Sequence, residues 1–482
     1  MRELLWTPSE EVQKASNMYA FMELVNREKG RNYRNYRELY RFSVDEPEAF
    51  WDILFRYLDI VHSVGYERTV DDIHRFPGAK WFPGCRLNYA ENLLRHEAND
   101  EACLIFRGED KVRRVLTWKD VKEQTFRLAT ALRELGVGAG DAVSAYLPNL
   151  PETIIAMLAT AAVGGVWCSC ATDIGPGAAF DRLGQVSPKV LFTTDGYYYK
   201  GKEFDTLPNA AQVAARMEGL KKVVVVHYAG KPEDIATVPN AVLYEDFLAK
   251  AVPEPFVYEQ REFNDPTVVM FSSGTTGKPK CMVQSVGGLL INQLKELVLH
   301  HDMKPSDRML YITTCSWMMW NWQAATLGAG SSIVLYDGNP SYPDLDAIWK
   351  VLEEEGGHRL RPLCQLYPRP DGCGLQPQGA CGPTEASHDF PDRLRPQRGG
   401  VPVRVSGDQA GPAFQLHRRR HGHQRLLLHR EPAEPSVRGR APGPGSGHAD
   451  RVLRRERQAC PGHAGRAGLR DPGAQHAHMV RQ

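Results

Sequence analysis

Four amino acids that occur in residues 1–356 are missing from the C-terminal part of this 482-residue chain. Residues 357–482 contain no Lys, Ile, Asn or Trp, but they contain 21 Arg, 18 Gly and 15 Pro. So much Gly and Pro, with little hydrophobic periodicity, is typical of chain that does not build a packed core. We therefore expect residues 357–482 to form a disordered or irregular tail without a stable fold.

Long apolar runs are also missing. No stretch of about 18 apolar residues occurs, and the N-terminus, MRELLWTPSEEV, has no apolar segment of signal-peptide length. The ten cysteines are scattered. This pattern argues against a membrane span and predicts a cytoplasmic protein with reduced thiols. Cys168 and Cys170 have no second pair nearby, so burial in a core is favoured over metal binding.

The charge is unevenly divided. Residues 1–356 carry a formal net charge of −10, whereas residues 357–482 carry +11. A basic tail of this kind would bind nucleic acid non-specifically through its charge. That function is the less favoured of two explanations for the tail, as shown below.

Residues 1–356 alternate between short apolar strands and helical patterns, which predicts an α/β fold with mainly parallel sheets. The expected strands are Cys103–Phe106, Ala142–Leu147, Lys189–Thr194, Lys222–His227, Thr267–Phe271, Met309–Thr313 and Ser332–Tyr336. One helix should begin after Thr117, with Asp120 completing a capping box, and end at Gly136. Further helices are expected near 152–163, 286–299 and 343–355.

The pattern divides the chain into four regions. Residues 1–95 are helical and aromatic, and are expected to form a cap. Residues 96–260 should form a first α/β subdomain, and residues 261–356 an incomplete second one. Residues 357–482 are the tail.

One loop carries the chemistry. Residues 267–280 read TVVMFSSGTTGKPK, a buried strand that runs into glycines and hydroxyls and ends with two lysines. Glycines let several backbone N–H groups turn toward one point, and hydroxyls and ammonium groups add donors and charge. The residues expected to bind a polyphosphate are Ser272, Ser273, Gly274, Thr275, Thr276, Gly277, Lys278 and Lys280. The spacing is not that of a Walker A loop, which has four residues between its glycines.

SSGTTGKPK resembles the phosphate-binding loop of the adenylate-forming acyl-CoA synthetases. The resemblance extends through about residue 356 and is greatest to the acetoacetyl-CoA synthetases. It is carried by NYAENLL (88–94), DRLGQVSPKVLFTTDGYYYKGK (181–202), HHDMKPSDRMLYITTCSWMMWNW (300–322) and VLYDGNPSYPD (334–344).

The resemblance implies an AMP-forming ligase for acetoacetate with ATP and CoA as substrates and Mg²⁺ as a partner of the phosphates. It implies that Trp317 lines the acyl pocket, and Trp320 is a second candidate, although tryptophans in this pattern also pack in cores. Gln284 stands where the family usually has His. No catalytic side chain and no metal ligand is identifiable up to residue 356.

The family motifs expected beyond residue 356 are absent from the tail. They are a Gly-Gly-Thr-acid segment for Mg²⁺, a Thr-Gly-Asp segment for the ribose, and a C-terminal domain with a catalytic Lys. Codons permitted for LCQLYPRPDGCG (363–374) allow SASYIHALMAAG when shifted by one base, which resembles the family's next helix. In the same shift, the codons around residues 417–425 allow GGTDIN. We infer a frameshift after about residue 356.

Three functions remain open on the sequence. The inherited activity is acetoacetate–CoA ligation, with acetate or propionate as the alternative acid. The chain as written could instead be a nucleotide-binding remnant without catalysis. The third is the nucleic-acid-binding tail already described. A membrane partner is not expected.

The frameshift is tested on the gene. We expect genomic sequencing across the codons for residues 353–360 to reveal a single-base insertion or deletion relative to close relatives, after which the downstream codons encode the missing motifs. An intact, reproducible frame that close relatives share would contradict the frameshift and favour a genuine basic tail.

Overall fold

The computed structural model describes residues 3–230, 232–249, 251–253, 255–272, 277–356, 360–363 and 436–438. The chain divides into two compact units. One comprises residues 6–436. The other comprises residues 1–5 and 437–482, where strand β1 (Glu3–Trp6) pairs with β18 (Ser436–Arg438). Apart from residues 360–363 and 436–438, the tail lies outside the described residues, so the expectation of an irregular tail stays a prediction.

The larger sheet of the main unit has seven strands. In spatial order they are β11 (Ala241–Leu243), β10 (Lys222–Val226), β7 (Val190–Thr194), β5 (Ala142–Tyr146), β6 (Val166–Cys170), β13 (Pro266–Ser272) and β14 (Lys280–Ser285). All neighbours are parallel except the last pair, in which β14 runs antiparallel to β13. The larger sheet therefore ends in a hairpin.

The smaller sheet has five strands. In spatial order they are β17 (Leu360–Leu363), β15 (Arg308–Tyr311), β16 (Ser332–Asp337), β3 (Ala102–Gly108) and β4 (Val112–Thr117). Only β3 and β4 are antiparallel. Two short antiparallel pairs complete the strands: β2 (Arg86–Leu87) with β12 (Arg261–Glu262), and β8 (Gly196–Tyr199) with β9 (Lys202–Asp205).

Helices follow most strands. Those of the N-terminal region are α1 (Glu10–Lys14), α2 (Asn17–Lys29), α3 (Tyr36–Asp45), α4 (Pro47–Tyr57) and α5 (Tyr89–Leu93). The others are α6 (Trp118–Glu134), α7 (Pro151–Ala162), α8 (Pro176–Leu183), α9 (Leu207–Ala214), α10 (Tyr244–Phe247), α11 (Val286–Leu294), α12 (Met318–Ala324) and α13 (Ala347–Glu355). Short turns of helix are η1 (Gly184–Val186), η2 (Pro232–Thr237), η3 (Lys295–His300) and η4 (Ala325–Ala329).

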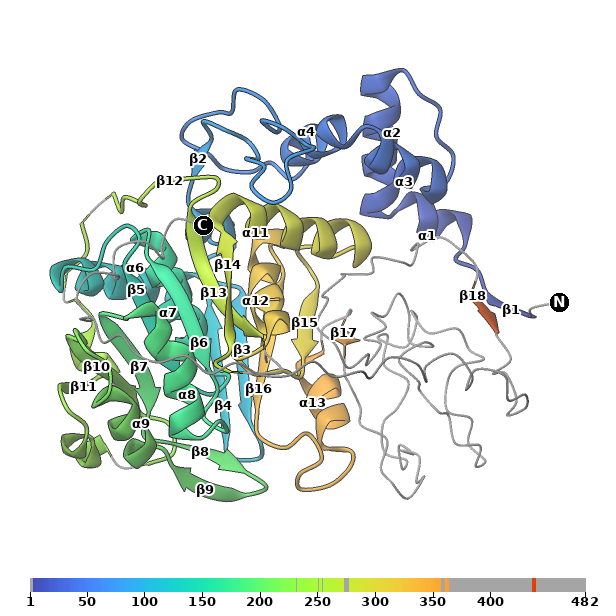
Figure 1. The fold of residues 1–482 in the computed structure, drawn as a ribbon. Coiled ribbons are helices and arrows are strands. Elements are labelled where there is room, and N and C mark those ends of the chain that lie inside the picture. Colours follow the sequence, from blue (N-terminus) through green and yellow to red (C-terminus); the bar gives the residue numbers. More distant parts are fainter. Residues whose placement is uncertain are drawn as a thin grey trace, which may run out of the picture. The chain divides into compact units, whose positions relative to one another are not determined.

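Side chains alternate between the two faces of a strand. One face of each sheet contributes to a core that the two sheets share. Leu104 of β3 and Phe192 of β7 belong to the same cluster as the apolar faces of α6 and α7, so these helices lie between the sheets. The next residue along β3, Ile105, belongs instead to a cluster with α13. Leu191 of β7 packs with α8 and α9. Helix and sheet layers thus alternate through the unit (Figure 1).

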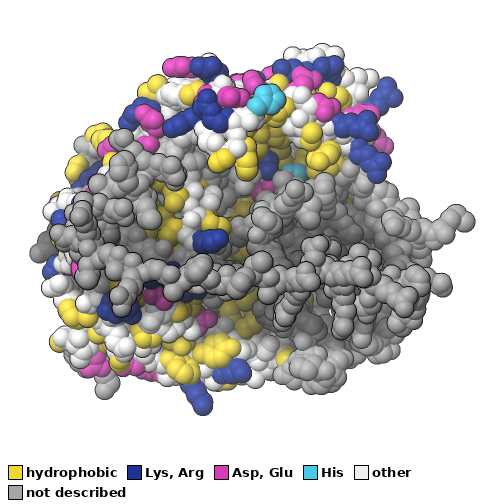
Figure 2. Space-filling view, in the orientation of Figure 1, with side chains coloured by type: hydrophobic (Ala, Val, Ile, Leu, Met, Phe, Trp, Pro, Cys, Tyr) yellow, Lys and Arg dark blue, Asp and Glu magenta, His cyan; other side chains and the backbone are white. Residues whose placement is uncertain are grey.

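The N-terminal helices have an apolar side against this core and a charged side toward solvent. Phe21 of α2 and Leu54 of α4 are fully buried in the shared cluster. On the exposed side, Arg56 pairs with Glu28 at 2.7 Å and with Asp52 at 2.9 Å. Basic and acidic side chains are interspersed over this region in Figure 2. Within the described part of the chain, no helix combines the length and apolarity needed to cross a bilayer.

The predicted α/β class is confirmed, and each of the seven predicted strands is present with ends shifted by no more than two residues. Two features differ from expectation. The helix expected at 343–355 begins only at Ala347. The predicted ranges also placed β3 in the first subdomain and β13 in the second, whereas β3 pairs with β16 and β13 pairs with β6. Each sheet thus takes two strands from the other range: the larger sheet contains β13 and β14, and the smaller sheet contains β3 and β4.

The capping box predicted at Thr117 is confirmed. The Thr117 hydroxyl accepts a hydrogen bond from the Asp120 backbone N–H at 3.1 Å, and the Asp120 carboxylate accepts one from the Thr117 backbone N–H at 2.8 Å. Gly136, with φ of 80°, follows the helix end at Leu135, as expected.

Replacing the cap should weaken the fold measurably. We expect Thr117→Ala to lower the free energy of unfolding by about 1 kcal/mol, because it leaves a helix N-terminal N–H without its partner. Chemical denaturation followed by circular dichroism measures the change. The exposed Thr7 is the matched control, and Thr7→Ala should change stability by less than about 0.5 kcal/mol. Equal effects of the two substitutions would contradict the assigned role of the cap.

Candidate functional site

The expected polyphosphate loop is the turn of the β13–β14 hairpin. Ser272 ends β13 and lies opposite Lys280, which begins β14. Ser273, Gly274, Thr275 and Thr276 lie outside the described residues, so their part in the site stays a prediction. The structure establishes where the loop leaves one strand and where it enters the next.

The exit of the loop has the conformation that the sequence indicates. Gly277 has φ of 86°, in the region that favours glycine, and no atom of the described residues lies within 4 Å of the position a Cβ would take. Lys278 and Lys280 are exposed, and neither side chain forms an ion pair or hydrogen bond with another described residue. Gln185 donates a hydrogen bond to the Pro279 carbonyl at 3.0 Å, which ties the hairpin to η1. The two ammonium groups are therefore available to an anion.

The period of the strands connects this turn to a cavity. Side chains two residues apart on a strand lie on the same face. Ser272 therefore shares a face with Met270, and Lys280 shares that face with Met282, which lies opposite Met270 in the register. Both methionines line a cavity of about 130 Å³. The loop that would bind phosphate and the cavity thus adjoin on one face of the hairpin.

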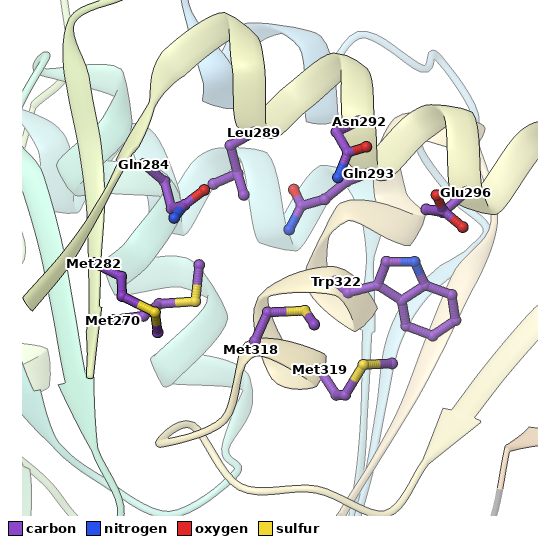
Figure 3. A pocket seen from close by; sticks show the side chains of 10 residues that line it. All are labelled: Met270, Met282, Gln284, Leu289, Asn292, Gln293, Glu296, Met318, Met319 and Trp322. Atoms are coloured by element: carbon purple, nitrogen blue, oxygen red, sulfur yellow. The ribbon is translucent and has the colours of Figure 1, made fainter. Parts of the chain in front are cut away.

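Three elements form the walls of the cavity. The hairpin and α12 supply one side, and α11 with η3 supplies the other (Figure 3). The lining residues are Met270, Met282, Gln284, Leu289, Asn292, Gln293, Glu296, Met318, Met319 and Trp322. Four thioether side chains give a deformable apolar lining, and amide and carboxyl groups provide a few polar contacts. This composition is typical of a site for a small organic molecule.

Hydrogen bonds hold α12 against the ends of the larger sheet. The Ser316 hydroxyl accepts from the Ala171 backbone N–H at 2.7 Å, and the Ser169 hydroxyl donates to the Cys315 carbonyl at 2.7 Å. The Trp320 indole N–H donates to the Asn149 side-chain carbonyl at 2.8 Å. These bonds fix the side of the cavity formed by Met318 and Met319.

The three tryptophans of this segment have different environments. Trp317, at the start of α12, is 67% exposed. Trp320 is fully buried and bonded as described, which is the core environment that the sequence left open for it. Neither lines the cavity, whereas Trp322 does. The pocket role of Trp317 and Trp320 therefore stays a prediction, and Trp322 was missed.

Most lining residues were missed by sequence reasoning, although two signals were present. Met270 and Met282 lie two residues from the motif residues Ser272 and Lys280, on the same face. Along the helix, polar residues interrupt a largely apolar segment, with Gln293 and Glu296 three positions apart and hence on one side. Gln284, singled out as a departure from the family pattern, is itself on the cavity wall.

Glu296 is the charged group at the far end of the cavity from the hairpin (Figure 3). It is 2% exposed, and burial raises the pKa of its carboxyl group. Lys295, 6% exposed, lies 3.0 Å from Glu296 Oε1 and partly offsets this effect. Neither carboxylate oxygen has a hydrogen-bond partner with suitable geometry among the described residues.

The cysteines and acidic residues supply no metal site within the described residues. No group of three or more His, Cys, Asp or Glu side chains there is arranged to hold a metal ion. We therefore assign no protein ligand to Mg²⁺. Cys168 and Cys170 are fully buried in an apolar cluster with α8 and α9, which confirms their predicted place in a core.

The family model for AMP-binding enzymes matches residues 92–359. The chain belongs to the AMP-binding enzyme family. A second model, for the N-terminus of acetyl-coenzyme A synthetase, matches residues 36–93. The loop, the hairpin and the cavity of this AMP-binding enzyme all lie within the first match.

Individual relatives are similar over the same region. An acetoacetyl-coenzyme A synthetase of Rhizobium meliloti is 43% identical over 352 residues, which cover 73% of this chain and 54% of that protein. A malonamoyl-CoA synthetase of Penicillium aethiopicum is 36% identical over 355 residues, which cover 70% of this chain and 48% of that protein. The structure of acetoacetyl-CoA synthetase from Streptomyces lividans superposes with a TM-score of 0.70 at 41% identity. The match covers 75% of this chain and 55% of that one.

The chain spans about half the length of the curated relatives it matches. The family match ends at residue 359, within three residues of the position where composition changes. This agreement supports the prediction that family-like sequence stops near residue 356. The frameshift as its cause stays a prediction.

The lysines of the hairpin are testable by nucleotide binding. We expect Lys278→Ala to weaken MgATP binding about tenfold, because a charge-assisted contact to phosphate is lost. The affinity of the variant should also depend less steeply on salt concentration. Isothermal titration calorimetry over a range of NaCl concentrations measures both.

Lys119, exposed at the start of α6, provides the control. Lys119→Ala should leave both the affinity and its salt dependence unchanged. A Lys278→Ala chain that binds MgATP as the parent does would rule out contact between this lysine and phosphate.

Proposed function

We propose that this AMP-binding enzyme derives from an AMP-forming acetoacetate–CoA ligase, with ATP and CoA as its other substrates. One observation carries the proposal. The hairpin turn with its two exposed lysines adjoins, on the same face, a cavity sized for a small organic acid. An acid held in the cavity would present its carboxylate to a triphosphate held at the turn.

The reaction has two displacements. A carboxylate oxygen attacks the α-phosphorus of ATP, the bond to the bridging oxygen breaks, and pyrophosphate leaves. The thiol sulfur of CoA then attacks the acyl carbon, AMP leaves with the bonding electrons of the acyl–oxygen bond, and the thiol proton is released. Pyrophosphate departs with a large negative charge, and fixed N–H, hydroxyl and ammonium groups at the turn would stabilise that charge as it develops.

The choice of acetoacetate is supported by the relatives. Several that match at 38–43% identity are named acetoacetyl-CoA synthetases. Another relative is named a malonamoyl-CoA synthetase. The malonamoyl group has an amide carbonyl at C3, the position at which acetoacetate has its ketone. The amide and carboxyl groups on the cavity wall are consistent with an acid that has such a polar atom in its chain.

We further propose that the 482-residue chain has little ligase activity. The sequence from residue 364 onward lacks the family segments expected to hold Mg²⁺ and ribose and to supply the catalytic lysine. The cytoplasmic location stays a prediction from the sequence.

Exchange of radiolabelled pyrophosphate into ATP measures the first displacement alone. With the frame corrected near codon 356, we expect exchange that depends on acetoacetate and exceeds that with acetate or propionate by at least about tenfold. The chain as written should exchange at a small fraction of that rate.

Three outcomes would contradict these proposals. If the frame-corrected protein preferred acetate or propionate, acetoacetate would not be its substrate. A normal rate from the chain as written would refute its predicted inactivity. ATP binding without exchange by either protein would favour a nucleotide-binding protein that has no ligase activity.

A further inference from the structure

The cavity contains a buried hydrogen-bond donor that has no acceptor among the described residues. Gln293 of α11 is 4% exposed, and its side-chain oxygen accepts a hydrogen bond from the Tyr89 hydroxyl at 2.8 Å. That bond orients the amide. The nitrogen, Nε2, has no hydrogen-bond partner among the described residues. Figure 3 shows it turned toward the space between α11, the hairpin and α12.

A donor buried in this way is costly to the folded protein. An amide removed from water without a partner loses about 1–3 kcal/mol. Most buried polar groups are therefore satisfied, and an exception at a cavity wall is a candidate contact for a ligand or an ordered water. The volume of about 130 Å³ exceeds what one water needs and accommodates a group of several non-hydrogen atoms.

The position of Gln293 selects the kind of acceptor. Met270 and Met282 line the end of the cavity nearest the hairpin, and Glu296 is at the opposite end. Gln293 lies between them along α11 (Figure 3). An acid whose carboxylate is at the turn would therefore bring an atom from the middle of its chain to Nε2. A hydrocarbon chain would leave the donor unpaired there, whereas a carbonyl oxygen would pair with it.

We propose that Gln293 is a specificity-determining residue, whose amide donates a hydrogen bond to the carbonyl oxygen in the chain of a short 3-oxo acid. The inference rests on the proposed function for the location of the carboxylate. Tyr89 is the positioning residue, because its hydroxyl holds the amide with the oxygen away from the ligand. Discrimination against the saturated acid then arises from a buried donor left without an acceptor.

The test compares acetoacetate with butyrate, which has the same number of carbons but a methylene in place of the carbonyl. The full chain is titrated with each acid in the presence of MgATP, with binding followed by ligand-observed NMR. The informative pair of variants is Tyr89→Phe and Tyr89→Phe/Gln293→Leu. Both lack the Tyr89–Gln293 bond, so they differ only in the amide at the cavity.

We expect the parent chain to bind acetoacetate about fivefold to tenfold more tightly than butyrate, in keeping with one neutral hydrogen bond. Tyr89→Phe should lower this ratio but leave it above one, because the amide remains at the cavity without the bond that orients it. The double variant should bring the ratio close to one, chiefly by weakening acetoacetate binding, while butyrate binding changes little. Thermal unfolding of both variants verifies that they fold alike.

An unchanged ratio in the double variant would overturn the inference and indicate that water satisfies Nε2. A parent chain that binds both acids equally would overturn it as well. The pyrophosphate exchange assay separates this failure from that of the proposed function. Exchange that depends on acetoacetate together with an unchanged ratio refutes the role of Gln293 alone. Selective acetoacetate binding by a frame-corrected protein without exchange refutes ligase activity alone.

Discussion

The antiparallel pairing of β13 with β14 is the constraint on which the site depends. It sets Ser272 opposite Lys280 and Met270 opposite Met282, so the ends of the expected polyphosphate loop and the methionine end of the cavity share one face. Because side chains alternate along a strand, a shift of β14 by one residue would turn Met282 away and bring Cys281 and Val283, which are exposed, toward the cavity wall. The hairpin in turn is held by the parallel pairing of β13 with β6.

The same sheet also positions α12, which carries other residues of the cavity wall. Hydrogen bonds from Ser169 and to Ser316 link the end of β6 to the segment that precedes α12. The Asn149 side chain accepts a hydrogen bond from the indole N–H of Trp320. The buried tryptophan therefore contributes to the site indirectly, by fixing the helix that carries Met318, Met319 and Trp322. Helix α11 closes the cavity with residues on one side, where the polar groups are concentrated.

The cavity combines two kinds of surface that serve different purposes. Methionine thioethers adapt to the shape of a ligand and contribute apolar contact, which gives affinity without much selectivity. The buried Gln293 amide, held by Tyr89, forms a hydrogen bond only with an acceptor that lies in the direction of its N–H group. Selectivity between acids of equal length would follow from the second kind of surface, since a methylene and a carbonyl differ little in size.

The sequence by itself determined the α/β class, the strands, the helix cap at Thr117 and the loop, because each depends on residues adjacent along the chain. It also located the change near residue 356, where the family match ends. Which strands share a sheet, and which of three tryptophans faces a cavity, were decided only by the tertiary structure. Gln293 illustrates the reason. Its partner Tyr89 is 204 residues away in the chain, and no local pattern shows that one atom of an amide is satisfied and the other is not.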